Sequence, residues 1–502
     1  MVLSSFKLFG EMAPGTWLGE GDPEVRNLVF DSREAKNGSL FFALRGTHAD
    51  GHSFIDEAYR QGCRAFVVEK VPKELYPQAL FRVVANSRWA MSPLSSAFYS
   101  HPSRKLEVIG VTGTDGKSST VSFLFQLLSL AGKKTGFFST VEFQIGQETR
   151  KNALRQSTPE APQIHQMLLE MVESGCTHAV LESTSHGLSE ITNRLGDVIY
   201  QGAVFTNVTT EHLEFHGTLE AYRQAKTRLF TFLDKGPLNS WGVVNFDDPH
   251  AHLFREATNR SVIGYAIEDL EAELRATDIQ SGTQGLEFTL HWKGKSQKTS
   301  CPVAGRFNVY NLMAALLAAS QSLKVDPLDL APLLEKLKGV KGRMFQVNQG
   351  QPFDVYVDYA HTPGAFSSIL PGMNQDSAGR LIVVFGSGGE RDRAKRPQQG
   401  QIADRYSDVI ILTDEDPRLE NPDQILSDIA SGIVKKTRGE TLFLIRPRQE
   451  ALRKAFEIAL PGDRVLLLGK GHESSIVLAQ GPTPWDEAEE AKNLLKDLGW
   501  RP

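Results

Sequence analysis

The sequence has few cysteines and no strong excess of charge of either sign. Its 502 residues include three cysteines, Cys63, Cys176 and Cys301, which lie far apart and lack metal-ligand spacing. Such a sparse, odd set gives no basis for a disulfide framework and is typical of a reducing compartment. The net charge of −5 carries no electrostatic signature of nucleic-acid or anionic-membrane binding. We therefore expect small-molecule partners, no nucleic-acid or membrane partner, and a monomer.

Long hydrophobic runs, internal repeats and low-complexity tracts are also missing. No apolar run approaches the ~20 residues that a helix needs to cross a bilayer. The first residues, MVLSSFKLFGEMAPGTWL, contain an acidic residue and a proline where a signal peptide needs an unbroken apolar core. These absences predict a cytoplasmic protein.

The chain length and the order of apolar segments predict an α/β protein with three domains. A chain of 502 residues is too long for one hydrophobic core, and domains of ~100–200 residues are typical. We expect a small α/β domain at residues 1–104, a P-loop-like domain with a mainly parallel sheet at 105–339, and a Rossmann-like domain at 340–502. The segment SHPSRK marks the first predicted domain boundary, and the basic, glycine-rich LKGVKGRM marks the second.

The segment GVTGTDGKSST, residues 110–120, has the composition of a phosphate-binding loop. Its three glycines permit backbone torsions that other residues avoid, so that successive amides can converge on an anion beside Lys117. A β-branched strand precedes the loop and an apolar-periodic helix follows it, as in nucleotide-binding proteins. The spacing GxxGxxGKS departs from the usual P-loop at Val111. A tight turn with a surface lysine is the alternative interpretation.

Two further residues follow predicted strands of the same sheet. Glu182 follows the strand THAVL, and His212 follows the strand AVFTNV. The carboxyl ends of parallel strands share one edge of a sheet, where ligands bind. With the Ser118 hydroxyl they predict a Mg²⁺ site, because this cation prefers oxygen ligands and can accept a nitrogen. A structural histidine and a capping or solvated carboxylate are the alternatives.

Nine segments of the chain together resemble a known family. They are GVTGTDGKSST, LESTSHG, TNVTTEHLEFHGT, AYRQAKTRLF, GRFNVYNLMAA, VDYAHTPGA, FGSGGERDRAKRP, TDEDPRLENP and GKGHES. They occur in the order expected of the Mur ligases, and the sequence most resembles the MurE members of that family. The similarity covers nearly the whole chain, including FDSREAKNGSLFFALRGTHADGHSFI near its start. The resemblance implies an enzyme that uses ATP to extend UDP-N-acetylmuramoyl-L-alanyl-D-glutamate with a diamino acid in peptidoglycan precursor synthesis.

The resemblance implies a site for ATP and Mg²⁺ in the central domain. It gives catalytic roles to Lys117, Lys226, Glu182 and His212, and it makes Ser118, Glu182, His212 and a carbamylated Lys226 the metal ligands. From the residues alone, Lys226 is expected on a solvated helix face. The residues implied to hold ATP are Gly113, Thr114, Asp115, Gly116, Lys117, Ser118, Ser119, Asn311, Arg343, Asp358 and His361.

The resemblance also implies sites for the other two substrates. The N-terminal domain would bind the UDP-sugar, and the C-terminal domain would bind the amino acid. The UDP-substrate residues would be Phe30, Ser32, Thr47, His48, Ala49, Gln156, Ser157, Thr158, Thr184 and Arg194. The amino-acid residues would be Arg391, Glu415, Asp416, Arg418, Gly469 and Glu473.

The identity of the amino acid depends on two residues with opposite effects. Arg418 favours meso-diaminopimelate, because a guanidinium can bind a far carboxylate with two parallel hydrogen bonds. Asp416 stands where diaminopimelate-adding enzymes usually have asparagine, and its charge would repel a carboxylate. We favour diaminopimelate, with L-lysine as the alternative.

Asp115 is a second departure, because the family usually has asparagine in the phosphate loop. A negative charge there opposes phosphate binding unless Mg²⁺ or a proton offsets it. A non-catalytic nucleotide-binding regulator, in which Asp115 abolishes turnover, therefore stays open as an alternative. A folylpolyglutamate synthetase-like ligase is a second alternative, because such enzymes share the Mur ligase fold and the activation chemistry.

Overall fold

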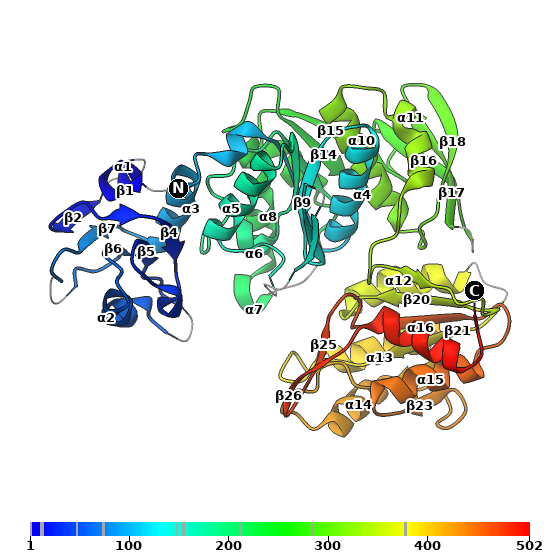
Figure 1. The fold of residues 1–502 in the computed structure, drawn as a ribbon. Coiled ribbons are helices and arrows are strands. Elements are labelled where there is room, and N and C mark those ends of the chain that lie inside the picture. Colours follow the sequence, from blue (N-terminus) through cyan, green and yellow to red (C-terminus); the bar gives the residue numbers. More distant parts are fainter. Residues whose placement is uncertain are drawn as a thin grey trace. The chain divides into compact units, whose positions relative to one another are not determined.

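The computed structural model describes residues 3–10, 15–46, 49–72, 76–146, 148–152, 156–209, 213–282, 285–375 and 379–501 (Figure 1). The chain divides into two compact units, Met1–Gly264 and Tyr265–Pro502. The strand β15 (Ser261–Ala266) contains the boundary between them. Within the described residues, no helix is both long enough and apolar enough to cross a membrane.

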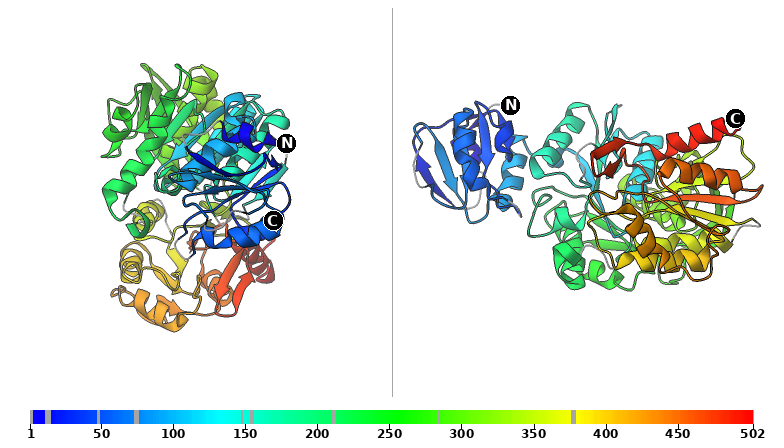
Figure 2. Two further views of the ribbon diagram at one scale, coloured as in Figure 1. Left: turned by 90° about the vertical axis from the view of Figure 1, so that its left-hand side faces the viewer. Right: turned by 90° about the horizontal axis from the view of Figure 1, so that it is seen from below.

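The first unit begins with a five-stranded sheet that is covered on both faces (blue in Figures 1 and 2). Successive residues of a strand point to opposite faces, so Phe42 packs in one core with the helix α3 (Ser87–Phe98), and Phe41 packs in the other with α2 (Ile55–Arg60). Only the edge strand β2 is antiparallel to its neighbour. The strand order is β2 (Thr16–Gly19), β7 (Leu80–Val83), β6 (Ala65–Val68), β5 (Ser39–Phe42) and β4 (Asn27–Val29).

The second sheet of this unit has a core of five parallel strands. Their apolar, β-branched residues are buried on both faces, as expected of a parallel sheet flanked by helices. The strands run in the order β11 (Glu148–Lys151), β10 (Glu142–Ile145), β9 (Thr135–Phe138), β12 (His178–Glu182), β8 (Glu107–Thr112), β13 (Gly202–Phe205) and β14 (Trp241–Asn245), of which β11 and β10 are antiparallel additions. The helices are α4 (Lys117–Leu130), α5 (Ala161–Glu173), α6 (Ser185–Leu188), α7 (Leu213–His216), α8 (Leu219–Leu233) and α9 (Ala251–Glu256).

The second unit starts with an antiparallel meander beside a long buried helix. The meander consists of β16 (Leu274–Gly282), β17 (Gly285–Trp292) and β18 (Lys295–Cys301). The helix α10 (Asn308–Leu323) is rich in alanine and leucine and is buried along most of its length. The short helix α11 (Pro327–Leu330) follows it.

The rest of the second unit is a six-stranded sheet between two helical layers. Five of its strands are parallel, and β19 is antiparallel at one edge. The strand order is β19 (Phe345–Val347), β20 (Asp354–Asp358), β24 (Arg464–Leu468), β21 (Leu381–Phe385), β22 (Val409–Leu412) and β23 (Leu442–Leu444). One core contains α12 (Pro363–Gln375), α13 (Lys395–Tyr406) and α14 (Pro422–Ala430), and the other contains α15 (Arg448–Ile458) and α16 (Glu487–Asp497).

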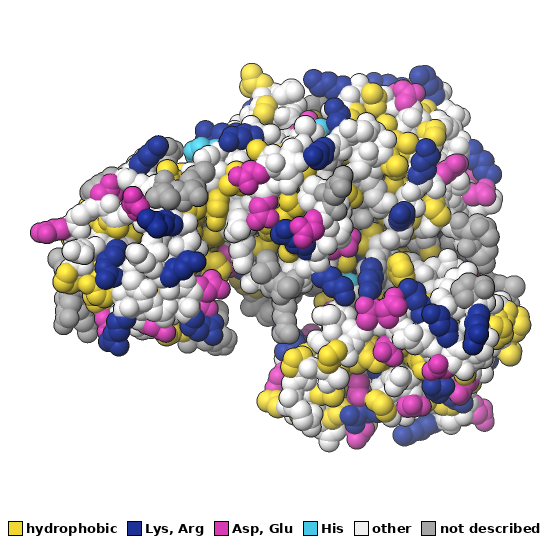
Figure 3. Space-filling view, viewed as in Figure 1, with side chains coloured by type: hydrophobic (Ala, Val, Ile, Leu, Met, Phe, Trp, Pro, Cys, Tyr) yellow, Lys and Arg dark blue, Asp and Glu magenta, His cyan; other side chains and the backbone are white. Residues whose placement is uncertain are grey.

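These sheets confirm the predicted α/β class with mainly parallel strands. Charged side chains of both signs are interspersed on the faces that Figure 3 shows.

A fully buried ion pair holds α15 and α16 to the carboxyl ends of two strands. The guanidinium of Arg448 contacts the carboxylate of Glu487 at 2.6 Å, and both side chains are fully buried. The same guanidinium donates to the carbonyls of Asp414, after β22, and Leu468, at the end of β24. Trp485 donates its indole N–H to Glu487. This pair therefore fixes the loops that follow β22 and β24.

We expect Glu487→Gln to destabilise the second unit by ~3–5 kcal/mol, because it leaves the Arg448 charge buried without its partner. Urea unfolding followed by circular dichroism measures this change. The control is Glu489→Gln on the same helix. Its carboxylate pairs with Lys492 at the surface, so its loss should cost no more than ~1 kcal/mol. Equal effects of the two changes would contradict the importance of the buried pair.

Candidate functional site

The predicted phosphate loop joins the end of β8 to the start of α4, and two of its glycines need their special backbone freedom. Gly113 has φ +153° and Gly116 has φ +81°. A Cβ atom on Gly113 would lie 1.8 Å from Oγ1 of Thr206, so the site tolerates no side chain there. Gly110 lies inside β8 without a positive φ, and a Cβ there would meet Leu229 at 2.6 Å. The interpretation of Gly110 as a loop glycine is therefore wrong, and close packing accounts for it.

The residues after β13 hold the backbone of this loop. Asn207 accepts the amide of Asp115 through its side chain at 2.9 Å and the amide of Thr114 through its carbonyl at 2.8 Å. The hydroxyl of Thr206 donates to the Asp115 carbonyl at 2.7 Å. Lys117 begins α4, and its ammonium donates to the Thr114 carbonyl at 2.6 Å. The loop is thus fixed at the N-terminus of α4, where the helix dipole favours an anion.

A buried carboxylate lies beside the start of α4. Glu182, at the end of β12, is 1% exposed and accepts the Ser118 hydroxyl at 2.8 Å. Its two oxygens also accept the amide N–H of Thr140 at 2.9 Å and the hydroxyl of Thr140 at 2.8 Å. The hydroxyl oxygen of Thr140 also lies within hydrogen-bonding distance of the Ser157 hydroxyl oxygen, at 2.6 Å. The predicted proximity of Ser118 and Glu182 at one sheet edge is therefore present.

Lys226 is buried, contrary to the solvated position expected from the residues alone. It lies in α8 and is 1% exposed. Its ammonium donates to the Gly113 carbonyl at 2.5 Å and lies 4.3 Å from the centre of the Tyr222 ring. The Tyr222 hydroxyl in turn contacts Oγ1 of Thr114 at 3.0 Å. Lys226 thus reaches from α8 to the backbone of the phosphate loop.

The predicted metal ligands are brought together only in part. Ser118 and Glu182 are hydrogen-bonded, whereas His212 lies outside the described residues. Within the described parts of the chain, no group of three or more His, Cys, Asp or Glu side chains could hold a metal ion.

Several predicted UDP-substrate residues form one hydrogen-bonded group near the end of β12. Thr158 donates to the Glu182 carbonyl at 2.8 Å, and it accepts the Thr184 amide at 3.1 Å. Arg194 donates to the Thr158 carbonyl at 2.8 Å and pairs with Glu160 at 2.8 Å. Glu160 was not anticipated from the sequence.

The remaining UDP-substrate predictions are dispersed. The Ser32 hydroxyl donates to Glu57 at 2.7 Å, and Phe30 packs partly buried against the core that contains α3. Ala49 and Gln156 are exposed. Thr47 and His48 lie outside the described residues.

In the second unit, three of the predicted nucleotide residues surround Tyr359. The Arg343 guanidinium lies 4.9 Å from the centre of the Tyr359 ring, and the His361 ring lies 4.8 Å from it. Asp358 is buried at the end of β20 and accepts the amides of Met344 and Ala360. These bonds fix the backbone on both sides of Tyr359 and beside Arg343.

Asn311, the fourth nucleotide prediction in this unit, is buried in α10. Its amide donates to the side chain of Asn308 at 2.8 Å.

The predicted amino-acid residues follow three parallel strands of the second unit. Arg391 follows β21 and is exposed; Glu415, Asp416 and Arg418 follow β22, and Gly469 and Glu473 follow β24. Gly469 has φ +99°, and a Cβ there would lie 2.7 Å from Oε2 of Glu415. The strand ends thus bring together residues that are far apart in the sequence.

Lys470, which the sequence reasoning missed, lies between two of these residues. Its fully buried ammonium contacts Asp416 at 2.7 Å and Glu473 at 2.5 Å. Burial raises the pKa of Glu473, nearby Asp416 and Glu415 act in the same direction, and Lys470 opposes them. His472, on the same loop, has its pKa lowered to about 3 by burial and by the neighbouring Arg343 and Lys470 charges. In the sequence, the position of this lysine within the segment GKGHES was the only indication of a role for Lys470.

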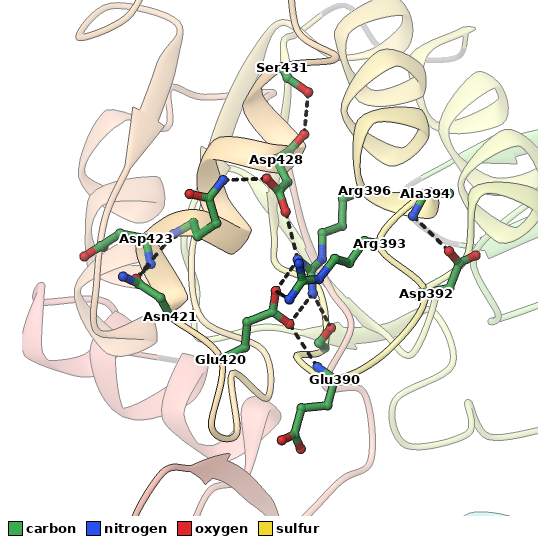
Figure 4. Close-up of polar contacts among 12 residues, drawn as sticks. Glu390, Asp392, Arg393, Ala394, Arg396, Glu420, Asn421, Asp423, Asp428 and Ser431 are labelled. Carbon is green, nitrogen blue, oxygen red and sulfur yellow. Dashed lines mark hydrogen bonds and ion pairs between the residues drawn. The ribbon is translucent and has the colours of Figure 1, made fainter.

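Arg396 and Glu420 were missed as well, although both lie in quoted motifs. Arg396 is fully buried and donates to both oxygens of Glu420 (Figure 4). Charged residues in segments such as KRP and LEN are usually solvated, so the sequence does not indicate that Arg396 and Glu420 form a buried pair.

The parallel sheets and the glycine loop at the start of α4 are typical of nucleotide-binding α/β proteins, and comparison with known proteins identifies the family. The sequence matches the descriptions "Mur ligase family, catalytic domain" at residues 24–99, "Mur ligase middle domain" at 111–319, and "Mur ligase, glutamate ligase domain" at 342–471. The chain belongs to the Mur ligase family.

Its relatives carry MurE-type names. A UDP-N-acetylmuramyl-tripeptide synthetase of Roseiflexus sp. (strain RS-1) is 46% identical over 492 residues, covering 95% of this chain and 96% of the relative. A UDP-N-acetylmuramoyl-L-alanyl-D-glutamate--2,6-diaminopimelate ligase of Clostridium tetani (strain Massachusetts / E88) is 36% identical over 487 residues, covering 96% of both. A solved structure of a ligase with the latter name is similar with TM-score 0.69, 29% identity and 99% of each chain covered.

These similarities confirm the resemblance to MurE-type enzymes and the prediction of an ATP-dependent ligase. The folylpolyglutamate synthase of Mycobacterium tuberculosis, at 14% identity and TM-score 0.62, shares the fold.

We expect Gly113→Ala to weaken nucleotide binding at least ~tenfold, because the positive φ alone costs about 1–3 kcal/mol in a residue with a Cβ. The clash with Thr206 adds to this cost. Isothermal titration with ADP measures the affinity. Gly132→Ala is the matched control, since Gly132 also has a positive φ, of +83°, but no atom lies within 4 Å of its added Cβ. A Gly113→Ala protein with unchanged affinity would exclude the loop as the phosphate site.

Proposed function

We propose that this enzyme uses ATP to join an amino acid to UDP-N-acetylmuramoyl-L-alanyl-D-glutamate through an acyl phosphate. The observation that carries the proposal is the fixed phosphate loop with a buried carboxylate, Glu182, bonded to Ser118 beside it. The names of the relatives support the substrate. The three domains with boundaries near residues 104 and 339 remain part of this proposal.

The reaction needs positioning and charge neutralisation more than covalent chemistry from the protein. The γ-phosphoryl group moves to the D-glutamate side-chain carboxylate, and ADP leaves. The incoming amine then attacks the acyl carbon, phosphate leaves with the bonding electrons, and the nitrogen loses a proton. Lys117 and the loop amides offset negative charge on the phosphoryl oxygens. Ser119, Asn311, Arg343, Asp358 and His361 are proposed to bind the nucleotide, as the resemblance implies.

The contacts of Glu182 fit a divalent cation. Among the described residues, the donors to its carboxylate are the neutral groups of Ser118 and Thr140, so the buried charge has no cationic side chain as a partner there. A buried carboxylate without a counter-ion is costly. The hydroxyl of Ser118 and the carboxylate oxygens are ligands that Mg²⁺ prefers. When bound, Mg²⁺ would neutralise phosphate charge, with Ser118, Glu182, His212 and a carbamylated Lys226 as its proposed ligands.

Lys226 is proposed to carry a carbamate. Its burial against the phosphate loop supports a specific role, since a lysine is rarely fully buried without one. Addition of CO₂ to the neutral amine, with loss of a proton, would give an anionic group with two oxygen ligands.

We expect Lys226→Ala to reduce turnover at least ~100-fold, the usual scale for losing one electrostatic group in an active site. Small carboxylates such as acetate or formate should restore part of the activity by supplying the missing anion. The measurement is ADP release with and without the carboxylate. Thr227→Ala is the control, because Thr227 is the next residue on α8 and its hydroxyl donates to the Gln224 carbonyl of the same helix. Full activity of Lys226→Ala, or no rescue by any carboxylate, would argue against the carbamate.

The amino-acid residues support a substrate with a second amino group. Glu415, Asp416 and Glu473 contribute three carboxylates, and Lys470, Arg391 and Arg418 contribute three cations. Partners for an ammonium group and for a carboxylate are therefore both present. Lys470 also pairs with Asp416, which reduces the repulsion that Asp416 would exert on a carboxylate. Arg418 then stays available as the carboxylate partner, so we retain meso-diaminopimelate over L-lysine.

The decisive experiment measures ADP release with UDP-N-acetylmuramoyl-L-alanyl-D-glutamate, ATP and each amino acid separately. We expect a higher kcat/KM with meso-diaminopimelate. Arg418→Ala should lower that value ~10-fold or more and leave L-lysine use nearly unchanged, because a charge-assisted bond contributes about 1.5–3 kcal/mol. Preference for L-lysine would overturn this choice. No amino-acid-dependent ADP release with any amino acid would instead support a nucleotide-binding regulator.

A further inference from the structure

A cluster of charged side chains joins two loops at the amino-acid end of the second unit (Figure 4). Its centre is Arg396, in the first turn of α13, with no exposed surface. The guanidinium donates to Glu420 from two nitrogens at 2.8 Å each, to Asp428 at 2.8 Å, and to the Gly388 carbonyl at 3.2 Å. This cluster therefore connects the loop after β21, the loop after β22, and the helices α13 and α14.

Glu420 connects the backbone of the two loops directly. It lies two residues after Arg418, and its carboxylate accepts the amide of Glu390, the residue before Arg391, at 3.0 Å. The Gly389 amide also donates to the Asp416 carbonyl at 2.8 Å. A Cβ on Gly389 would lie 2.0 Å from the Pro417 carbonyl oxygen, so the loops are as close as glycine allows. The positions of Arg391 and Arg418 are thus coupled through one carboxylate.

The side chain of Glu420 is ionised at neutral pH. Its hydrogen bonds with Arg396 lower the pKa of Glu420 to about 2, so the carboxylate is ionised at neutral pH. Arg393 adds a third cation-carboxylate contact at 3.0 Å, and its side chain is mostly exposed. Among the described residues, Arg396 donates to both oxygens of Glu420, whereas Arg393 contacts one of them. The paired contact fixes the orientation of the Glu420 carboxylate as well as its charge.

We propose that Arg396 and Glu420 are positioning residues that set the separation of Arg391 and Arg418, and thereby the selectivity for the far end of the amino acid. The inference rests on the proposed function, because it assigns the two arginines to the amino-acid site. Arg396 has no exposed surface, and the proposal assigns neither Arg396 nor Glu420 a contact with the substrate. They act through the two loops that they hold together.

The test compares Glu420→Gln with Asp428→Asn in the full-length enzyme. Glu420→Gln removes the charge that holds both loops, so we expect the KM for meso-diaminopimelate to rise about tenfold, equivalent to ~1.4 kcal/mol. The KM values for ATP and the UDP-substrate should stay within about twofold, and the kcat/KM ratio of meso-diaminopimelate to L-lysine should fall. Asp428→Asn removes another partner of Arg396 but leaves the Glu390 contact, so its KM for the amino acid should change less than about threefold.

A conservative change separates positioning from general stability. Arg396→Lys keeps the positive charge and loses the two-pronged contact, so it should shift the amino-acid preference in the same direction as Glu420→Gln. Thermal unfolding of each variant shows that the fold is retained. A ratio of amino-acid preferences that is unchanged in folded Glu420→Gln and Arg396→Lys proteins would overturn the inference. If the wild-type enzyme shows no amino-acid-dependent turnover, the proposed function itself fails, which is a distinguishable result.

Discussion

The buried carboxylate of Glu182 is the group on which the organisation of the first site depends. It ends β12, and its oxygens hold the hydroxyl of Ser118 in α4 and the backbone after β9. A charge in this position must be compensated by donors or a cation, and donors from two neighbouring segments converge on it. The phosphate loop, held by Thr206 and Asn207, completes the same edge of the sheet. One costly buried charge therefore joins the end of β12 to the segments that follow β8 and β9.

The second unit uses the same architectural rule with a different set of charges. The carboxyl ends of β21, β22 and β24 carry the residues proposed to bind the amino acid. Lys470 pairs with the carboxylates of Asp416 and Glu473. Arg448 and Arg396 donate to backbone carbonyls of the loops after β22 and β21. Each of the three cations is buried and contacts carboxylates or carbonyls, which offsets its desolvation. Rigid loops follow from this arrangement, as preorganised binding requires.

The parallel sheets and the phosphate loop could be predicted because they depend on local patterns. Short apolar strands such as LIVVF and the sequence from Gly113 to Ser118 determine their own conformation. Burial of Lys226 could not be predicted, since its helix has charged neighbours and its environment comes from the distant Gly113 carbonyl. The pairing of Arg396 with Glu420 likewise joins residues 24 positions apart. Residue patterns report local structure, whereas these contacts depend on how loops meet in three dimensions.

The complete burial of Arg448 and Glu487 has a consequence for behaviour in salt. Mobile ions screen charges that they can approach, and at physiological ionic strength screening acts over ~8 Å. Exposed pairs such as Lys298 and Glu287 are open to such ions. The Arg448 pair has no solvent-accessible surface, so dissolved ions cannot come between its partners. The attachment of α16 to the loops after β22 and β24 should therefore persist across osmotic changes that weaken the ion pairs of the surface.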